Sequence, residues 1–224
     1  MKNGKKLILR IAVAMMCAAM AVSALPAAAF AEDVLAVSSG EGQNTTSGDS
    51  GATEADHVQW SFDETTGTLT ISGTGAMEDY GYNITKKEAT QPWKDIHQSV
   101  TKVVVAEGVT YIGAHAFDGV STVTEYDFPS TVTSMGDWPI AVHSVQTYQV
   151  APGNLFYSVE NGMLMKRDGS DVSLVGYPCA DGKTSITIPN DTTRIESGSF
   201  EWNHKLTSLT LPDSVEYIGG WMFS

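Results

Sequence analysis

Histidine, cysteine and acidic residues are the first candidates for chemistry in this chain, and their spacing supports no reaction. The five histidines stand far apart and form neither an HExxH pattern nor a ligand set with a cysteine. The turn Asp168–Asp171 carries two carboxylates but lacks the fuller spacing of an EF-hand calcium loop. The sequence contains no GxSxG motif and no phosphate-binding loop. We therefore predict no catalytic residue, no metal site and no cofactor.

The chain is organised by an apolar pattern that returns about every 23 residues. In each copy two apolar residues stand two positions apart, so both side chains point to one face of a short strand. These pairs are Val103/Val105, Tyr126/Phe128, Ile186/Ile188 and Leu209/Leu211. Proline follows three of the pairs, and it ends a strand because it cannot donate a backbone hydrogen bond. A period in this range is typical of a leucine-rich-type solenoid.

We predict a β-rich α/β solenoid, in which about five leucine-rich-type repeats fill residues 100–224. Short parallel strands stack on one side, and short helical or irregular return segments add core residues such as Ile112 and Phe117. One repeat cannot fold alone. Its apolar side chains contribute roughly 1.5–3 kcal/mol each, against roughly 1.5 kcal/mol of ordering entropy for every residue. Stacking closes that gap, so the repeats depend on one another.

Residues 57–99 differ from the repeats and are predicted to cap the N-terminal end of the solenoid. Apolar and polar residues alternate on both sides of Asp63–Gly67, which predicts a β-hairpin. Gln91–Val100 has the pattern of a short helix with a proline in its first turn. We expect Trp60 and Trp93 to cover the core of the first repeat.

A second departure lies in the middle of the chain, over Ala151–Pro178. Apolar runs there flank Asn161–Gly162 and then Asp168–Gly169, and both dipeptides favour tight turns between strands. We predict that this unit replaces the usual return segment with an inserted β-hairpin of two or three strands.

The first residues indicate export. Lysines and an arginine precede an apolar run over Ile11–Leu25, and Ala29–Ala31 offers a small-x-small cleavage site. We assign residues 1–31 to a signal peptide, and a membrane anchor is the competing interpretation. Residues 32–56 are rich in serine, glycine, threonine and acid, and we predict a disordered linker there.

Cleavage after Ala31 removes four basic residues and no acidic one, so the formal charge falls from −13 to −17. Such a surface repels nucleic acid and anionic lipid, so we expect neither as a partner and no membrane insertion of the mature chain. The mature chain retains one cysteine, Cys179, so no intramolecular disulfide can form within it. We expect this cysteine to be a small buried apolar residue.

The remaining candidates for function lie on the surface. If Val103 and Val105 face the core, their neighbours face outward and form a polar strip along the strands. The predicted binding residues of this strip are Lys102, Glu125, Asp127, Thr147, Gln149, Ser185, Thr187, Ser208 and Thr210. Simple solvation of the strands is the competing interpretation. At another register position, shared by His115, Trp138, Gly198 and Trp221, we expect the tryptophans to pack on neighbouring repeats.

The repeats resemble the BspA-like leucine-rich repeat family of secreted and surface bacterial proteins. The unit Pro-x-x-Val-x-x-Ile-Gly-x-x-x-Phe carries the resemblance, as in LPDSVEYIGGWMF (Leu211–Phe223) and, without the proline, in VAEGVTYIGAHAF (Val105–Phe117). The opening WSFDETTGTLTISGTGAM and the hairpin unit ENGMLMKRDGSDVSLVGYP also match its layout. The resemblance implies an adhesin or interaction module with no shared catalytic motif.

Two hypotheses for function follow. The first is a secreted, non-enzymatic leucine-rich repeat protein that acts in adhesion or in protein or glycan binding at the cell surface. The alternative is a targeting or spacer region of a larger surface protein or enzyme. Because the sequence stops inside a repeat, we expect either a longer natural polypeptide or self-association through the strand Ser208–Leu211.

Overall fold

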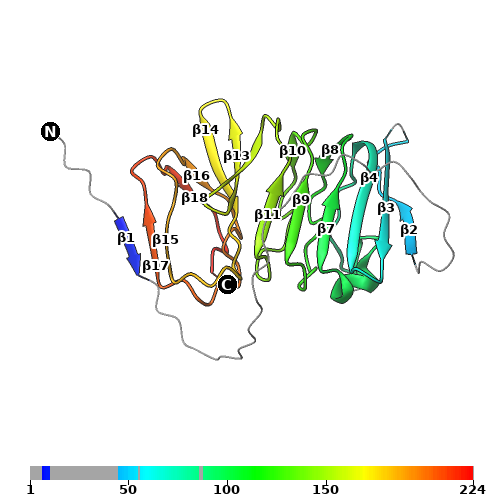
Figure 1. The fold of residues 1–224 in the computed structure, drawn as a ribbon, viewed down its shortest axis with the longest axis horizontal. Helices are drawn as coiled ribbons and strands as arrows, with labels where there is room; N and C mark the ends of the chain where they lie inside the picture. The colour runs from blue at the N-terminus through cyan, green and yellow to red at the C-terminus, as the bar shows by residue number, and fades with distance from the viewer. Residues whose placement is uncertain (1–6, 11–44, 55, 86–87, 224) are drawn as a thin grey trace.

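The computed structural model describes residues 7–10, 45–54, 56–85 and 88–223. Over these residues the chain is a β-solenoid (Figure 1). Its one helix in the described ranges is the 3-10 helix η1 (Lys94–Ser99). No helix in the same ranges is long and apolar enough to cross a membrane.

The first part of the solenoid, which we call the front stack, is built on parallel strands in register. β7 (Lys102–Val105), β9 (Glu125–Phe128) and β11 (Thr147–Val150) lie side by side, with Val103 opposite Tyr126 and Tyr126 opposite Tyr148. The side chains of Val103, Tyr126 and Tyr148 are buried. The residues on either side of each of them along the strand face outward. The predicted strand phase is therefore confirmed for this stack.

A second row of short strands runs along the return side of the front stack. It contains β8 (Val109–Ile112) and β10 (Ser134–Met135), which pair in parallel. The long strand β4 (Thr68–Ala76) joins the rows, because its first half pairs with β7 and its last residues pair with β8. β4 also pairs with β3 (His57–Asp63) in an antiparallel hairpin.

The return segments contain turns and short strands rather than helices, so the helical part of the predicted returns is not observed. The backbone explains this difference. His115 has φ 52° and Gly119 has φ 80°, and two left-handed residues four positions apart interrupt a right-handed helix. The small strands β5 (Tyr82–Asn83) and β6 (Glu88–Ala89) form a separate pair before η1.

The predicted disordered linker is wrong for its last part. Thr45–Asp49 forms strand β2, which pairs antiparallel with β3. Gly48 lies against Trp60, because a Cβ atom there would come within 2.7 Å of the indole Nε1. The polar segment is ordered because it covers this tryptophan and the open edge of β3. Of the predicted signal peptide only Leu7–Arg10 is described, and residues 32–44 and 55 of the predicted linker lie outside the described residues.

Aromatic rings run through the core of the front stack. The Trp60 and Trp93 ring centroids are 6.1 Å apart, and Trp93 stacks on Phe117 at 5.7 Å. The Trp93 indole N–H donates to the Ala116 carbonyl oxygen over 3.1 Å. Phe117 then contacts Tyr126 at 5.7 Å. These two tryptophans therefore lie where the first repeat meets the preceding segment.

The inserted unit contains three antiparallel strands, as the two turn dipeptides predict. They are β12 (Tyr157–Glu160), β13 (Met163–Asp168) and β14 (Asp171–Gly176). Asn161 and Gly162 connect the first two strands with φ values of 53° and 86°, as a two-residue hairpin turn requires.

The second part of the solenoid, the back stack, contains two further ladders. β14 pairs in parallel with β16 (Arg194–Ile195), which pairs with β18 (Tyr217–Ile218). β15 (Ser185–Thr187) pairs in parallel with β17 (Ser208–Leu211). The core of this stack contains Tyr177, Phe200 and Phe223, with centroid separations of 5.2 and 5.5 Å.

Both ladders are interrupted at the unit that carries the inserted strands. Within the described residues β11 pairs with β9 but not with β15, and β10 pairs with β8 but not with β14. The first strand of this unit thus belongs to the front stack, and its return strand belongs to the back stack. Figure 1 shows the break between the green and cyan strands of one stack and the yellow to red strands of the other.

The outer edge of β17 was expected to present unpaired backbone groups, and the structure corrects this. β1 (Leu7–Arg10) pairs antiparallel with β17, with Leu7 opposite Leu211 (Figure 1). The physical reason is that an open strand edge pairs with an available extended segment. Cleavage after Ala31, which the sequence predicts, removes β1 from this edge.

Candidate functional site

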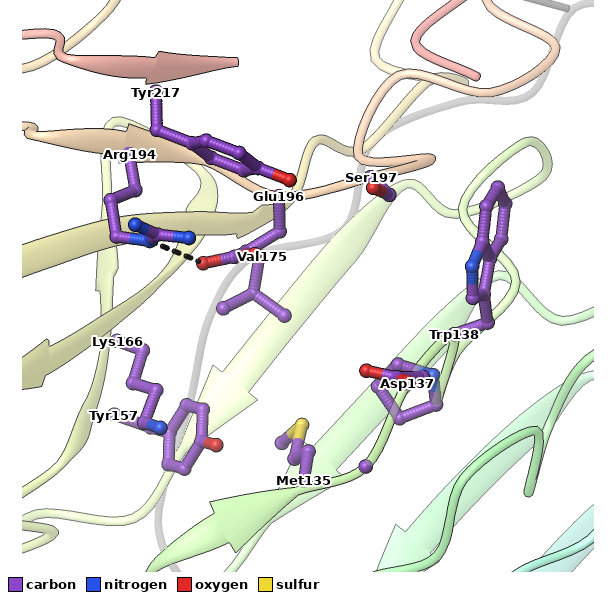
Figure 2. Close-up of a pocket in the computed structure, with 12 residues that line it drawn as sticks. Met135, Asp137, Trp138, Tyr157, Lys166, Val175, Arg194, Glu196, Ser197 and Tyr217 are labelled. Atoms are coloured by element: carbon purple, nitrogen blue, oxygen red, sulfur yellow. Dashed lines mark ion pairs between the residues drawn. The ribbon is translucent and has the colours of Figure 1, made fainter. Parts of the chain in front are cut away.

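The interruption of the return-side ladder leaves a cavity of about 460 Å³ between the two stacks. We call it the junction groove (Figure 2). Its lining residues come from the return after β10, from the inserted strands and from β16 and β18. They are Met135, Gly136, Asp137, Trp138, Pro139, Tyr157, Lys166, Val175, Arg194, Glu196, Ser197 and Tyr217.

One wall of the junction groove carries two cations. Arg194 lies over the ring of Tyr217, with its guanidinium carbon 4.2 Å from the ring centroid. Its Nε atom is 3.5 Å from a carboxylate oxygen of Glu196. Lys166 lies on β13, which β14 separates from β16, and it has no ion-pair partner within the described part of the chain. In Figure 2 both cations lie on the same side of the groove.

The opposite wall is formed by the return after β10, where Asp137 and Trp138 lie (Figure 2). The Trp138 ring is in contact with Gly198, where an added Cβ would come within 2.5 Å of it. This contact joins the front stack to the back stack, as expected for packing on a neighbouring repeat. Trp221, at the same register position, is instead 70% exposed.

The shared register position has an unusual backbone. His115, Trp138, Gly198 and Trp221 have φ values of 52°, 50°, 72° and 55°. Glycine adopts this left-handed conformation without strain, whereas side chains such as tryptophan rarely do. The left-handed conformation of Trp138 is therefore a property of this repeat position, and it places the indole at the wall of the groove.

The floor of the groove is buried and anchored. Tyr157 is buried beside Met135 in the lining of the groove. Burial raises the pKa of Tyr157 well above its ordinary value, so the hydroxyl stays protonated at physiological pH. Ser197 accepts a hydrogen bond from the Gly220 backbone N–H over 3.2 Å. No histidine or cysteine lines the groove, so it offers donors, acceptors and rings without a nucleophile–base pair.

The strip of predicted binding residues faces outward on the strands but is divided in two. On the front stack Lys102, Glu125 and Thr147 are aligned in one row, and Asp127 and Gln149 are aligned in the next. On the back stack Ser185 faces Ser208 and Thr187 faces Thr210. The two parts are not one continuous sheet, because β11 does not pair with β15 in the described chain.

The acidic patch of the strip is partly neutralised. The Lys102 ammonium group is 2.8 Å from a Glu125 carboxylate oxygen, and the Gln149 amide donates to the same oxygen over 2.6 Å. Burial and the nearby Glu125 charge raise the pKa of Asp127, and Lys102 opposes this rise. The front part of the strip is thus a network of alternating donors and acceptors.

The remaining candidates from the sequence lie apart from the groove. Cys179 is a buried free thiol, and burial raises its pKa to about 12, so it is not a reactive nucleophile. His143 and His204 lie with Ser121 and Trp202 around a shallow surface hollow. Within the described ranges, no group of three or more His, Cys, Asp or Glu residues is arranged to hold a metal ion.

The junction groove itself was not predicted from the sequence. Its residues come from three repeats and an insertion, and no short motif connects them. The only signal was the departure from the repeat pattern at Asp137–Ile140, where the pattern has Ala-Phe. The break in the ladder depends on how the inserted strands pack, and the repeat period does not contain that information.

The strands, returns and period define a leucine-rich-repeat-type solenoid. The profile of the "BspA type Leucine rich repeat region" family matches six copies over residues 95–160 and 179–224, half of the chain. The chain therefore belongs to the BspA-type leucine-rich repeat family. No curated protein matches the chain.

Several solved structures are similar to the chain. A leucine-rich repeat protein from Eubacterium ventriosum is 20% identical, with a TM-score of 0.38, over 79% of this chain and 62% of that one. A leucine rich cell surface protein from Faecalibacterium prausnitzii is 22% identical, with a TM-score of 0.44, over 56% and 39%. The pneumococcal vaccine antigen PcpA is 15% identical, with a TM-score of 0.43, over 73% and 65%. The chain spans less than two thirds of the length of each of these proteins.

Proposed function

We propose that the chain is a non-enzymatic binding module of a secreted, cell-surface leucine-rich repeat protein, and that it adheres to an extracellular protein or glycan. The observation that carries this proposal is the pair of in-register polar rows on the front stack. Repeat proteins bind partners through extended surfaces of this kind, because each repeat contributes the same outward positions. The sequence pattern of residues 1–31 supports export.

The electrostatic balance of the chain supports the choice of partner. Acidic residues outnumber basic residues by 26 to 13. The strand surface presents serine, threonine, glutamine, one lysine and two carboxylates, all of which hydrogen-bond to protein backbones and to sugar hydroxyls. A nucleic acid or an anionic membrane does not fit this surface.

A binding screen tests the proposal. Purified protein 32–224 is passed over immobilised extracellular matrix proteins and a glycan array, and saturable binding to at least one of them is expected. Asp127→Lys, in the strip, should weaken that binding at least tenfold. Asp171→Lys makes the same charge change at an exposed site outside the strip and the groove, and it should leave binding unchanged. Absence of saturable binding would favour the targeting or spacer role in a larger protein.

A further inference from the structure

We propose that the junction groove is a second binding site, separate from the strand strip, and that it takes a carboxylated sugar of an extracellular glycan. The proposal rests on the proposed function only in that the chain must meet glycans outside the cell. Three features of the groove carry it. Lys166 has no ion-pair partner in the described residues, and Arg194 has one ion pair of 3.5 Å and a contact with the Tyr217 ring. Acceptors lie on both walls, and aromatic rings line the groove.

The cations indicate a negatively charged ligand. Lys102, Arg167 and Lys183 each lie within 3.0 Å of a carboxylate oxygen, as expected in so acidic a chain. Lys166 has no such partner in the described residues, and the single ion-pair contact of Arg194 is 3.5 Å long. These two cations line the same cavity. A carboxylate that enters the groove accepts charge-assisted hydrogen bonds from both, which are stronger than neutral ones.

The acceptors and rings indicate that the carboxylate belongs to a sugar. Asp137 and Glu196 accept hydrogen bonds, and sugar hydroxyls donate them. Trp138 and Tyr217 offer aromatic surface, whose negative face attracts the C–H groups of a sugar ring. A sugar acid carries its carboxylate and its hydroxyl donors on one ring, so it can reach both walls at once. An extended peptide spreads such groups over about 3.3 Å per residue.

The size and construction of the groove agree with such a ligand. Its volume of about 460 Å³ is in the range of small-molecule sites. The walls come from both stacks and are fixed by the contact between Trp138 and Gly198. Trp138 has φ 50°, and its register mates His115 and Trp221 have the same left-handed conformation, so the repeat backbone sets the direction of the Trp138 side chain at the wall.

The test is a titration of protein 32–224, labelled with ¹⁵N, with monosaccharides. D-glucuronate is compared with D-glucose, which differs only in having a hydroxymethyl group in place of the carboxylate. We expect saturable shift changes at the groove residues with D-glucuronate, and at least tenfold weaker binding of D-glucose. Lys166→Gln should weaken D-glucuronate binding at least fivefold, and Arg194→Gln should do so as well. Lys205→Gln removes an exposed lysine outside the groove and should change nothing.

Further arms of the titration separate the sources of the sugar. N-acetylneuraminate represents animal glycans, and N-acetylmuramate represents bacterial cell walls. Binding of either, with the same loss in Lys166→Gln, supports the shared chemistry and identifies the source. Equal affinity for D-glucuronate and D-glucose, or shifts outside the groove, would overturn the proposal. Binding of a blocked Glu-Glu dipeptide in preference to every sugar acid would also overturn it. Because Asp127→Lys leaves the groove intact, loss of partner binding at the strip and loss of sugar binding are separate results.

Discussion

At the scale of single residues, the left-handed backbone positions of the repeat explain where its tryptophans lie. Trp138, Trp202 and Trp221 all have positive φ, with values between 50° and 59°. Trp60 and Trp93 are buried in the front stack. Trp202 is 55% exposed, and its register mate in the first repeat is Gly119, with φ 80°. The repeat thus has two positions where glycine fits without strain and where this chain also places large aromatic side chains.

The left-handed position of Trp202 predicts an inverted preference between glycine and alanine. At ordinary backbone angles alanine is more stable than glycine by roughly 0.4–1 kcal/mol, because glycine gains more entropy on unfolding. At φ 59° alanine carries the steric cost of the left-handed conformation and glycine does not. We expect Trp202→Gly to exceed Trp202→Ala in free energy of unfolding by about 1 kcal/mol in urea titrations. A more stable alanine variant would show that this segment relaxes to another conformation.

Two histidines predict how stability depends on pH. Burial lowers the pKa of His97, opposed by the charges of Asp118 and Asp95, and burial also lowers the pKa of His143. The unfolded chain therefore binds protons more readily than the folded chain as pH falls below about 6.5. Their contribution to stability is complete above that pH and is lost as pH falls through the folded pKa values.

The measurement is the urea midpoint at pH 7.5 and at pH 5.5. We expect the lower midpoint at pH 5.5. The difference should shrink in the double variant His97→Gln/His143→Gln, because its glutamines do not titrate. Most carboxylates stay ionised over this interval, so acid unfolding does not obscure the effect. An unchanged difference in the double variant would assign the pH dependence to other groups.

At the scale of elements, the strand phase can be tested on adjacent residues. Ile188 is fully buried after β15, and Thr187 faces outward beside it. Ile188→Asp places an unpaired charge in the shared core and should cost more than about 4 kcal/mol of unfolding free energy. Thr187→Asp should change stability by less than about 0.5 kcal/mol. Circular dichroism during urea titration distinguishes them, and similar losses in both variants would contradict the observed register.

The elements that could be predicted from the sequence are those whose pattern, an apolar alternation or a turn dipeptide, lies within a few neighbouring residues. Val103 and Val105 fix the phase of β7, and Asn161–Gly162 fixes the turn between β12 and β13. β2 was missed because its sequence, TTSGD, has no apolar alternation. It forms a strand only because the edge of β3 and the indole of Trp60 are available, and both come from distant parts of the chain.

The candidate site was predictable only in part for the same reason. In a strand, successive side chains point alternately inward and outward, and this fixes which residues form the outward row. The sequence therefore placed Asp127 and Gln149 on the same surface. The junction groove requires knowing that β10 and β14 do not pair. Lys166 and Arg194 are 28 positions apart and belong to different units, so no periodic argument places them together.

At the scale of the whole molecule, the inserted unit makes the solenoid a chain of two cooperative parts. The stability of a repeat protein is the sum of the stabilities of its repeats and of the interfaces between neighbouring repeats. A weak interface therefore lets the repeats on its two sides unfold separately. Neither strand ladder crosses from the front stack to the back stack in the described residues. The return segments still connect them, for instance where the Ala180 N–H donates to the Val145 carbonyl oxygen over 2.9 Å.

This arrangement predicts that the back stack opens before the front stack unfolds. The front stack has a core of aromatic rings in mutual contact from Trp60 to Tyr148, and β3 and β4 cover its first repeat. In the back stack Tyr217 and Ile218 are 41% and 51% exposed, so less apolar surface is buried there. Hydrogen exchange of the mature chain in increasing urea, followed by mass spectrometry, should show loss of protection in β15 and β17 at urea concentrations where β7 and β9 remain protected.

Pro139→Gly, in the return that faces the back stack, should widen the interval between the two losses, since it loosens the segment that holds Trp138 against Gly198. Simultaneous loss of protection in both stacks at every urea concentration would show that the contacts of the return segments alone make the solenoid one cooperative unit.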